Sequence, residues 1–206
     1  TVNIPAKLAW SATDADSGVS RYELQQSTNG GPYANVSLPT TTATSNTRFL
    51  APGSSYQFRV RAQDGAGNWS GWEAGPQFLA TAHQEGSGAI SYAGPWAQES
   101  SSTAYGGGVS YTQAKGAKAT FTFTGRDVAW VATKGPDRGK AEVWVDGVKA
   151  KSVDLYASTQ DPRKTVFSQH WADAGEHTVE VRVLGTRNAS STGTLVDLDA
   201  IIVLSD

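Results

Sequence analysis

Cysteine and methionine are both absent from this 206-residue chain, and charged residues make up only 17% of it. The lack of cysteine excludes disulfides and thiolate metal sites, and it leaves the redox compartment open. No run of apolar residues approaches the roughly 20 needed to cross a bilayer, so we expect no membrane insertion. The formal net charge of -2 argues against a nucleic-acid partner, which needs a concentrated basic surface.

Helical periodicity is nearly absent as well. Short runs of alternating apolar and polar residues, separated by Gly, Pro, Asn and Asp, dominate the chain, and such runs are typical of sandwiches and barrels. The pattern predicts an all-β protein with two β-sandwich domains in tandem, an immunoglobulin-like domain and then a jelly roll. We place the domains at residues 1–80 and 89–206, with the small polar stretch 81–88 as a linker.

The start of the chain shows no signal peptide. We therefore expect a fragment of a longer protein, whose parent chain carries a catalytic or surface domain. A disulfide-free β protein rich in Thr and Gly is common among secreted bacterial proteins, so we expect a secreted or cell-surface location.

The first domain is expected to contain strands at 6–11, 21–27, 47–50, 55–64 and 77–81. The clearest of them contains the segment 56–62, which alternates without interruption. This alternation places on one face Tyr56, Phe58, Val60 and Ala62, and on the other Gln57, Arg59 and Arg61.

A series of motifs runs through this domain: Leu8-Ala-Trp10, Arg21-Tyr-Glu-Leu24, Leu50-Ala-Pro-Gly-Ser-Ser-Tyr56, Arg59-Val-Arg-Ala62, and Asp64-Gly-Ala-Gly-Asn-Trp-Ser70 followed by Trp72. With these motifs the domain resembles a fibronectin type III module. The resemblance implies that Trp10 lies in the core and that Tyr56 anchors a corner by a hydrogen bond to the backbone. Little precedes Trp10, which predicts a short or missing first strand.

The second domain is expected to contain eight strands, a number that suits a jelly roll. We place them at 90–93, 117–124, 127–133, 140–145, 148–155, 163–169, 175–184 and 195–204. Alternation within the strands predicts inward-facing side chains at Phe121, Phe123, Val128, Trp130, Val143, Val145, Val179, Val181 and Val183.

An Asp146-Gly147 turn predicts a two-residue hairpin in this domain. Its register would set Trp144 across from Lys149 and Glu142 across from Lys151, and a slip in the alternation predicts a bulge beyond residue 152. On this polar face Trp144 is either a stacking platform for a sugar ring or a tryptophan covered by a loop, by Lys149 or by the first domain.

The last strand carries two carboxylates, Asp197 and Asp199, which are expected to point to the same side roughly 7 Å apart. Two like charges there are unfavourable unless a cation or a basic side chain lies near. Calcium would suit them, since it takes about six to eight oxygen ligands, and Glu99 is a candidate further ligand. The alternative is that Arg, Lys or backbone amides pair with the two carboxylates.

Two loops are rich in hydrogen-bond donors, one around Lys134 and Arg138 and one around Arg187 and Asn188. A planar guanidinium can grip a carboxylate or hydroxyls, so these loops are candidates for contacting an acidic or polyhydroxylated ligand. The alternative is that Arg138 is tied within the sandwich, for example to Asp137, Asp154 or Asp197.

The motifs of the second domain are Tyr92-Ala-Gly-Pro-Trp96, Gly116-Ala-Lys-Ala-Thr-Phe-Thr-Phe-Thr-Gly125, Trp130, Lys134-Gly-Pro-Asp-Arg-Gly-Lys-Ala141, Val145-Asp-Gly147, His177-Thr-Val179, Gly185-Thr-Arg-Asn-Ala189 and Val196-Asp-Leu-Asp-Ala200. Together they look like the galactose-binding-like jelly-roll modules appended to secreted bacterial hydrolases and surface proteins. The layout is similar to calcium-containing carbohydrate-binding modules, although those open with a Glu-Ala-Glu-like strand where this chain has Ile90-Ser-Tyr-Ala93.

No residue pattern indicates catalysis. The three histidines, His83, His170 and His177, lie outside any recognisable nucleophile or zinc motif. Asp197 and Asp199 are neighbours on one strand, whereas glycoside hydrolysis uses carboxylates that flank the scissile bond. We therefore do not expect an enzyme.

The sequence favours a non-catalytic accessory fragment that binds a polysaccharide or glycan through its second domain, with the first domain as a spacer. The aromatic side chains of Trp96, Trp144 and Tyr156 would supply affinity together with the donor loops. Two alternatives stay open: a structural or adhesive stalk with no small-molecule ligand, and a protein-recognition fragment.

Overall fold

The structure is a computed structural model that describes residues 3–205, except for the side chain of Pro5; Thr1, Val2 and Asp206, which the predicted domains include, lie outside the described residues. The chain is all-β, with 64% of its residues in strands, and it divides into two compact units, Asn3–Ala80 and Thr81–Ser205. The fold class predicted from the alternating runs is confirmed. Within the described range no helix is long and apolar enough to cross a bilayer.

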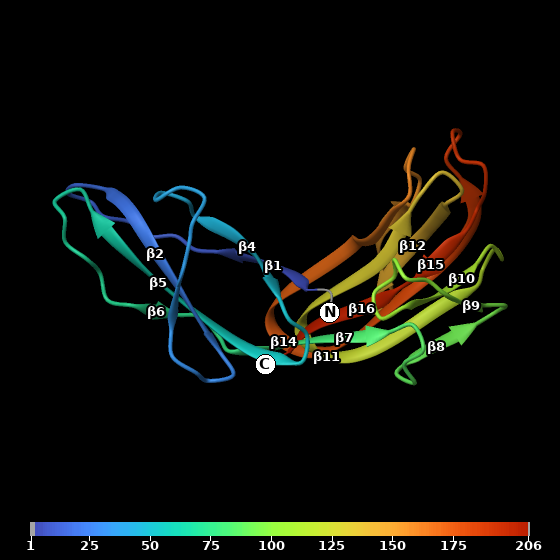
Figure 1. Ribbon diagram of the computed structural model, residues 1–206, viewed down its shortest axis with the longest axis horizontal. Helices are drawn as coiled ribbons and strands as arrows, with labels where there is room; N and C mark the ends of the chain where they lie inside the picture. Colours follow the sequence, from blue (N-terminus) through green and yellow to red (C-terminus); the bar gives the residue numbers. More distant parts are fainter. Residues whose placement is uncertain (1–2, 206) are drawn as a thin grey trace. The chain divides into compact units, whose positions relative to one another are not determined.

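The first unit is built from two sheets (Figure 1). One sheet pairs β1 (Ile4–Ala9) with β4 (Ser45–Leu50). The other sheet has the order β3 (Ala34–Val36), β2 (Val19–Thr28), β5 (Ser54–Asp64). Two more strands also pair with β5: β6 (Glu73–Ala74) and the start of β7 (Phe78–Gln84). The buried side chains of this unit include Ile4, Tyr22, Leu24, Leu50, Tyr56 and Phe58.

Tyr56 occupies the corner that leads into β5. Its ring is 4% exposed, and its hydroxyl donates a hydrogen bond to the carbonyl oxygen of Ala51 over 3.0 Å. Trp10, by contrast, is only half-buried and meets Tyr22 edge to face, with 6.3 Å between the ring centroids.

Replacing Tyr56 with Phe is expected to lower the free energy of unfolding of the first unit by about 1 kcal/mol, because the carbonyl of Ala51 loses its donor while the ring keeps its packing. Urea unfolding of the full chain, followed by hydrogen exchange of amides in β5, measures this change. A Tyr33→Phe variant provides the control, because it removes a hydroxyl that donates to the Gln57 side chain, from a more exposed tyrosine of the same unit. Equal effects of the two substitutions would contradict the role of the corner.

The second unit contains nine further strands: β8 (Ile90–Ala93), β9 (Ala97–Ser100), β10 (Gly108–Thr112), β11 (Lys118–Lys134), β12 (Gly139–Val145), β13 (Val148–Asp154), β14 (Asp161–Arg187), β15 (Val196–Leu198) and β16 (Ala200–Ser205). The larger sheet runs β13-β12-β14-β11-β16, with β8 added to β11 and the end of β7 beside β16, and a small sheet has the order β15-β10-β9. Figure 1 shows β11 and β14 as the long strands of this unit. The nine side chains predicted to face inward are all buried.

Four of the predicted strands join into two long ones. The expected breaks near residues 126 and 172 are absent, because Gly125 pairs with Gly175 and a register shift follows at once. A side chain at Gly125 would lie 2.8 Å from the carbonyl oxygen of Leu204, so glycine lets the ribbon bend there while the pairing of β11 with β14 continues. The prediction missed β9 and β10, and it missed the division of the last strand into β15 and β16.

Part of the stretch predicted as a linker is a strand. Residues 81–84 form the end of β7, and only 85–88 form a turn. The ring of His83 lies 4.7 Å from that of Phe121, and burial lowers the pKa of this histidine. A polar composition concealed the strand because only one of its faces packs against apolar groups.

The β12–β13 hairpin confirms one predicted pair and corrects another. Trp144 does lie across from Lys149, but Glu142 pairs with Ser152 instead of Lys151. The register shift occurs between Val143 and Trp144, closer to the turn than the predicted bulge. The early shift turns Val153 and Leu155 into the core.

Candidate functional site

Asp197 is buried and is used inside the second unit. The residue is 1% exposed, and its Oδ2 accepts a hydrogen bond from the backbone N–H of Thr133 at 2.9 Å. Its Oδ1 lies 3.8 Å from Nε of Arg138. Burial raises the pKa of Asp197, although the Arg138 charge and the Thr133 bonds act in the opposite direction. Asp197 is therefore the internal counter-charge of an arginine.

Asp199 lies between β15 and β16 and is completely buried. One carboxylate oxygen, Oδ1, accepts a hydrogen bond from the backbone N–H of Tyr105 at 2.8 Å. The other, Oδ2, has no hydrogen-bond partner within residues 3–205. Burial, reinforced by the negative charges of Asp197 and Glu85, raises the pKa of Asp199 to about 7 against the lowering effect of the Tyr105 N–H.

Two further side chains join Asp199 in what we call the oxygen pocket, defined by Gln84, Glu85 and Asp199. The N–H of Glu85 donates to the carbonyl oxygen of Asp199 at 3.2 Å. Gln84 Oε1 and Glu85 Oε2 are, like Asp199 Oδ2, buried oxygens that lack a hydrogen-bond partner in the described part of the chain. Buried polar atoms are rarely left unpaired, so each of these oxygens lacks the donor or cation that a buried oxygen ordinarily has.

The glycine loop that follows Tyr105 closes the oxygen pocket. Gly106 lies directly against Gln84 Oε1, and Gly108 lies directly against Glu85 Oε1, so that a Cβ atom at either glycine would collide with these oxygens. Gly106 also has a φ of 83°, a backbone conformation that favours glycine. The loop can therefore approach the two side chains only because these positions carry no side chain.

The ligand set predicted for calcium is not assembled. Glu99 is exposed on β9 across from Val109, and among residues 3–205 no three acidic, histidine or cysteine side chains form a group that could hold a metal. Asp197 and Asp199 take different partners because the strand is interrupted between them. The sequence analysis missed Gln84 and Glu85. They lie at and just after the end of β7, within the stretch that was predicted to be a linker.

Several of the predicted donor residues gather around Asp154. We call this group the loop cluster, and it consists of Lys134, Lys140, Asp154, Tyr156 and Asn188. Asp154 accepts hydrogen bonds from the Asn188 amide at 2.9 Å and from the backbone N–H of Tyr156 at 3.0 Å, and Lys140 Nζ lies 3.7 Å away. Burial alone would raise the pKa of Asp154, but these bonds and the charges of Lys140 and Lys134 outweigh it and lower the pKa.

Backbone hydrogen bonds hold the segments of the loop cluster together. The N–H of Gly135 donates to Leu155, and the N–H of Ala157 donates back to Gly135, over 3.0 and 3.1 Å. The Gln160 side chain fills the place that a side chain at Gly135 would need. The half-buried side chains of Lys134, Tyr156 and Asn188 are therefore presented from a fixed frame.

Two of the predicted ligand-binding arginines are used internally. The Arg138 side chain is 11% exposed and lies between Asp197, at 3.8 Å, and Asp137, at 3.7 Å. This is the internal tie that the sequence left open as an alternative. Arg187 is exposed, and its Nη1 donates to the carbonyl oxygen of Thr192 at 3.0 Å.

Trp144 lies on the outer face of the larger sheet, but its ring is covered. The guanidinium carbon of Arg182 is 3.7 Å from the ring centroid, and the indole N–H donates to Glu142 at 3.1 Å. Lys149 pairs with the same glutamate at 2.5 Å. The ring is therefore covered by Arg182, a residue that none of the alternatives drawn from the sequence had included.

Trp96 lies apart from the loop cluster. Its ring packs against Tyr92 with 5.0 Å between the centroids, and its indole N–H donates to the carbonyl oxygen of Ala93 at 3.3 Å. It is half-buried against the core of the second unit. The structure thus places the three predicted aromatic ligands at three different positions, and only Tyr156 belongs to the loop cluster.

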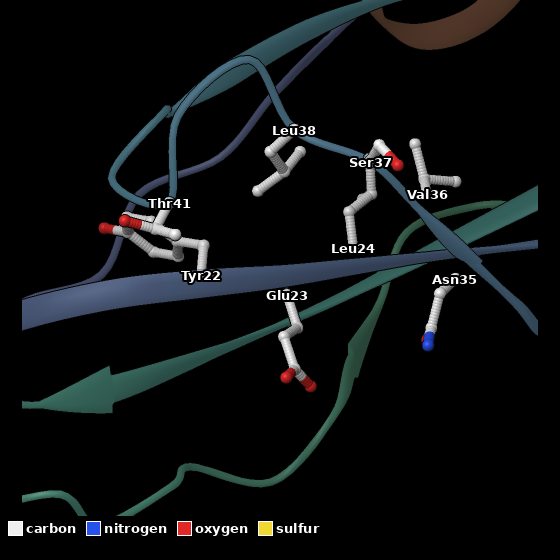
Figure 2. A pocket seen from close by; sticks show the side chains of 8 residues that line it. All are labelled: Tyr22, Glu23, Leu24, Asn35, Val36, Ser37, Leu38 and Thr41. Atoms are coloured by element: carbon white, nitrogen blue, oxygen red, sulfur yellow. The ribbon is translucent and has the colours of Figure 1, made fainter.

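A cavity of about 250 Å³ lies in the first unit, where the segment after β3 crosses β2 (Figure 2). Leu24 and Leu38 point toward it, whereas Glu23 and Asn35 point to the other side of the sheet. The carbonyl oxygen of Thr41 already accepts a hydrogen bond from the backbone N–H of Tyr22 at 2.7 Å. No charged side chain points into the cavity in Figure 2, and we assign no ligand to it.

Comparison with known proteins gives one relative by sequence. A stretch of 90 residues, 44% of this chain, is 32% identical to the A type blood N-acetyl-alpha-D-galactosamine deacetylase of Flavonifractor plautii. That stretch covers only 12% of the enzyme, so the chain spans a small part of the length of the relative it matches. No family model matches the chain.

Solved structures with a similar fold belong to carbohydrate-active or carbohydrate-binding proteins. They include a Paenibacillus xanthan lyase (13% identity, 74% of this chain and 21% of that one, TM-score 0.48) and a family two carbohydrate esterase from Cellvibrio japonicus (17%, 63% and 34%, 0.45). The carbohydrate-binding module CBM36, solved with calcium and xylotriose, is 15% identical over 61% of this chain and 99% of its own, with a TM-score of 0.35. At these identities and at TM-scores below 0.5, these likenesses carry no conclusion about this chain.

Proposed function

We propose that this chain is a non-catalytic accessory fragment of a secreted or cell-surface bacterial protein and that it binds a glycan through its second unit. The observation that carries the proposal is the loop cluster, in which segments more than fifty residues apart hold two lysines, the Asn188 amide and the backbone N–H of Tyr156 around one carboxylate. Sugar sites combine an aromatic face with a few oriented polar groups. Lys134, Tyr156 and Asn188 supply these elements.

Each unit has a place in this proposal. The second unit, Thr81–Ser205, is a galactose-binding-like jelly roll, and the first, Asn3–Ala80, is a fibronectin type III-like spacer. The hydrogen bond from Tyr56 to Ala51 supports the second assignment, since a tyrosine corner is typical of that module. The sequence similarity to a deacetylase named for N-acetyl-alpha-D-galactosamine supports a carbohydrate-active parent protein and makes glycans with that sugar the first ligands to test.

We propose calcium as the partner of the oxygen pocket. Three buried oxygens there lack hydrogen-bond partners, two of them belong to carboxylates, and calcium prefers oxygen ligands. Gln84, Glu85 and Asp199 would hold the ion. When bound, the ion neutralises the repulsion between the two carboxylates, and the three residues then link the end of β7 to the last strands of the second unit.

Glycan binding is expected to weaken about tenfold when Tyr156 is replaced with Ala or Asn188 with Ala, because each change removes a stacking surface or a hydrogen-bonding group worth about 1–1.5 kcal/mol. A glycan array followed by calorimetric titration of the full chain with the best ligand, with calcium present, measures the effect. Asn46→Ala, in the first unit, is the matched control. Binding that all three substitutions leave unchanged would place the ligand elsewhere.

A structural stalk is the second candidate function. It is favoured by the surroundings of the two tryptophans that were predicted to bind sugar. Arg182 lies over the ring of Trp144, and the ring of Trp96 packs against Tyr92. If a diverse glycan array shows no saturable binding to the calcium-loaded chain, the stalk replaces the glycan-binding proposal.

A further inference from the structure

The outer face of the larger sheet in the first unit carries a row of alternating guanidinium and aromatic groups. Arg59 lies over the ring of Tyr33 at 3.9 Å and over that of Trp72 at 4.7 Å. Arg61 lies 4.7 Å from the Trp72 ring and 4.4 Å from the Trp69 ring. The row ends at Arg21, which is 5.1 Å from Trp69. We call these six residues the cation–π face.

The strand pattern explains why this face points outward. Arg59 and Arg61 alternate on β5 with the inward residues Tyr56 and Phe58, as the sequence predicted. On the neighbouring strand, Glu23 points to the side of the sheet opposite Leu24 (Figure 2). Asn35, on the edge strand β3, lies on the same outer side as Glu23. The arginines of the face therefore lie on β2 and β5, and its aromatic residues lie in the segments that precede β3 and β6.

Neighbouring polar groups fix the guanidiniums in position. Arg59 donates two hydrogen bonds to the amide oxygen of Gln25, at 2.8 and 2.7 Å. The same amide donates to Asn35 at 2.8 Å. Arg61 donates two hydrogen bonds to Glu23, at 2.9 and 2.6 Å. A preorganised guanidinium loses little conformational freedom when it binds.

Charge on this face is unbalanced. It carries three guanidiniums, and the carboxylate that contacts them is Glu23, which is shared by Arg21 and Arg61. Arg59 has the neutral Gln25 as its hydrogen-bonding partner. The Arg21 and Arg61 side chains are 45% and 30% exposed, so solvent reaches them. A surface with an excess of fixed positive charge attracts anions.

The surrounding groups select among anions. A planar guanidinium matches a carboxylate or a sulfate through paired hydrogen bonds. Amides such as Gln25 and Asn35 suit hydroxyl groups, and aromatic side chains suit sugar rings. An acidic polysaccharide offers all three features in one repeating chain. An acidic peptide offers the carboxylates but lacks the rings and hydroxyls.

We propose that the cation–π face binds an anionic polysaccharide, so that the first unit is a second glycan-binding module in addition to its role as a spacer. The site is distinct from the loop cluster and recognises a different chemical class, because its contacts are made through guanidiniums. Its existence does not depend on glycan binding by the second unit.

Titration of the full chain with an oligogalacturonate in low salt tests the proposal. Binding is expected to be saturable, to weaken as salt rises, and to fall about fivefold to tenfold in Arg59→Gln and in Arg61→Gln, since each loses a charge-assisted pair. Arg59→Lys keeps the charge without the planar fork and is expected to fall in between. Lys7→Gln removes the same charge from the other sheet and is expected to have no effect.

Each alternative outcome is decisive. Absence of oligogalacturonate binding overturns the proposal, and so does a loss that is equal in Lys7→Gln and Arg59→Gln. Equal binding of poly-glutamate of the same charge would show that the partner is an acidic protein and would overturn it too. Binding that falls in Tyr156→Ala but not in Arg59→Gln would assign the anionic glycan to the loop cluster. Circular dichroism and thermal melting of each variant establish that the first unit remains folded.

Discussion

Calcium added to the metal-free chain at pH 7 is expected to raise the melting temperature of the second unit by roughly 10 °C, and Asp199→Asn is expected to abolish this rise. A ligand at 100 times its dissociation constant stabilises the folded state by about 2.7 kcal/mol, which corresponds to that shift for a unit of this size. The reason lies in the oxygen pocket, where the buried carboxylate of Asp199 has one oxygen without a partner and Glu85 beside it.

The pH dependence of the metal-free chain follows from the same residue. The folded-state pKa of Asp199 is raised from 3.8 to about 7, so its contribution to stability is fully present below about pH 4 and is lost as the pH rises to 7. The loss is at most about 4 kcal/mol, from 1.36 kcal/mol per pKa unit. Asp199→Asn removes this loss of stability. Burial also raises the pKa of Asp197, so the pH-dependent loss that Asp197 causes persists in the variant.

Differential scanning calorimetry between pH 4 and pH 8, with calcium or with a chelator, measures both effects. Glu99→Gln is the matched control, because it removes one acidic charge that the sequence, but not the structure, assigns to the metal. Its calcium response is expected to equal that of the unaltered chain. A calcium shift that survives Asp199→Asn, or no shift in the unaltered chain, would contradict a cation at this site.

Replacing Arg138 with Met is expected to lower the free energy of unfolding of the second unit by about 3–5 kcal/mol. The substitution leaves the carboxylate of Asp197, which is 1% exposed, without its positive partner in a buried position, and breaking a buried pair on one side is costly in this way. The variant is expected to melt roughly 10–20 °C lower. Chemical unfolding, with the second unit's transition followed separately, measures the change.

A double variant separates the pair from simple loss of packing. Arg138→Met combined with Asp197→Asn removes both charges, and it is expected to recover part of the lost stability, since no charge is then left unpaired. Arg187→Met, at an exposed arginine that donates to Thr192, is expected to cost under about 1 kcal/mol. A double variant less stable than Arg138→Met alone would disprove the account.

Arg138 and Arg187 show a limit of prediction from the sequence. Both stand in Gly-containing, donor-rich loops, and composition alone gave them the same predicted role in ligand binding. Arg138 is buried because its loop is drawn against the last strands, where the N–H of Gly139 donates to Leu195 at 2.8 Å. No feature of the local sequence distinguishes that arginine from Arg187.

The calcium ligands illustrate a related limit. The sequence predicted that Asp197 and Asp199 need a cation or a basic side chain nearby, because two like charges recur in the last strand. The structure shows that Asp199 is buried and that its Oδ2 has no hydrogen-bond partner in the described part of the chain. The sequence analysis assigned Asp197 and Glu99 to the same ion as Asp199. Asp197 lies near Asp199 in the sequence, and Glu99 lies near it in the expected layout. In the structure the strand is interrupted at Asp199, and Glu85, in the turn after β7, donates its N–H to the carbonyl oxygen of Asp199. The cation proposed for Asp199 therefore has a different set of neighbours from the set that the sequence predicted.

The period of two in the apolar residues by itself determined the all-β class and the side chains of the core. The period is visible in the local sequence, and burial follows it in much of β5, β11, β12 and β14, whereas β9 is exposed throughout and β15 is buried throughout. Only the tertiary structure decided which polar groups meet, such as Asp199 with Tyr105, Arg138 with Asp197, and Arg182 with Trp144. Such meetings depend on the register between strands distant in sequence, and a single bulge alters that register without leaving a mark in the local pattern.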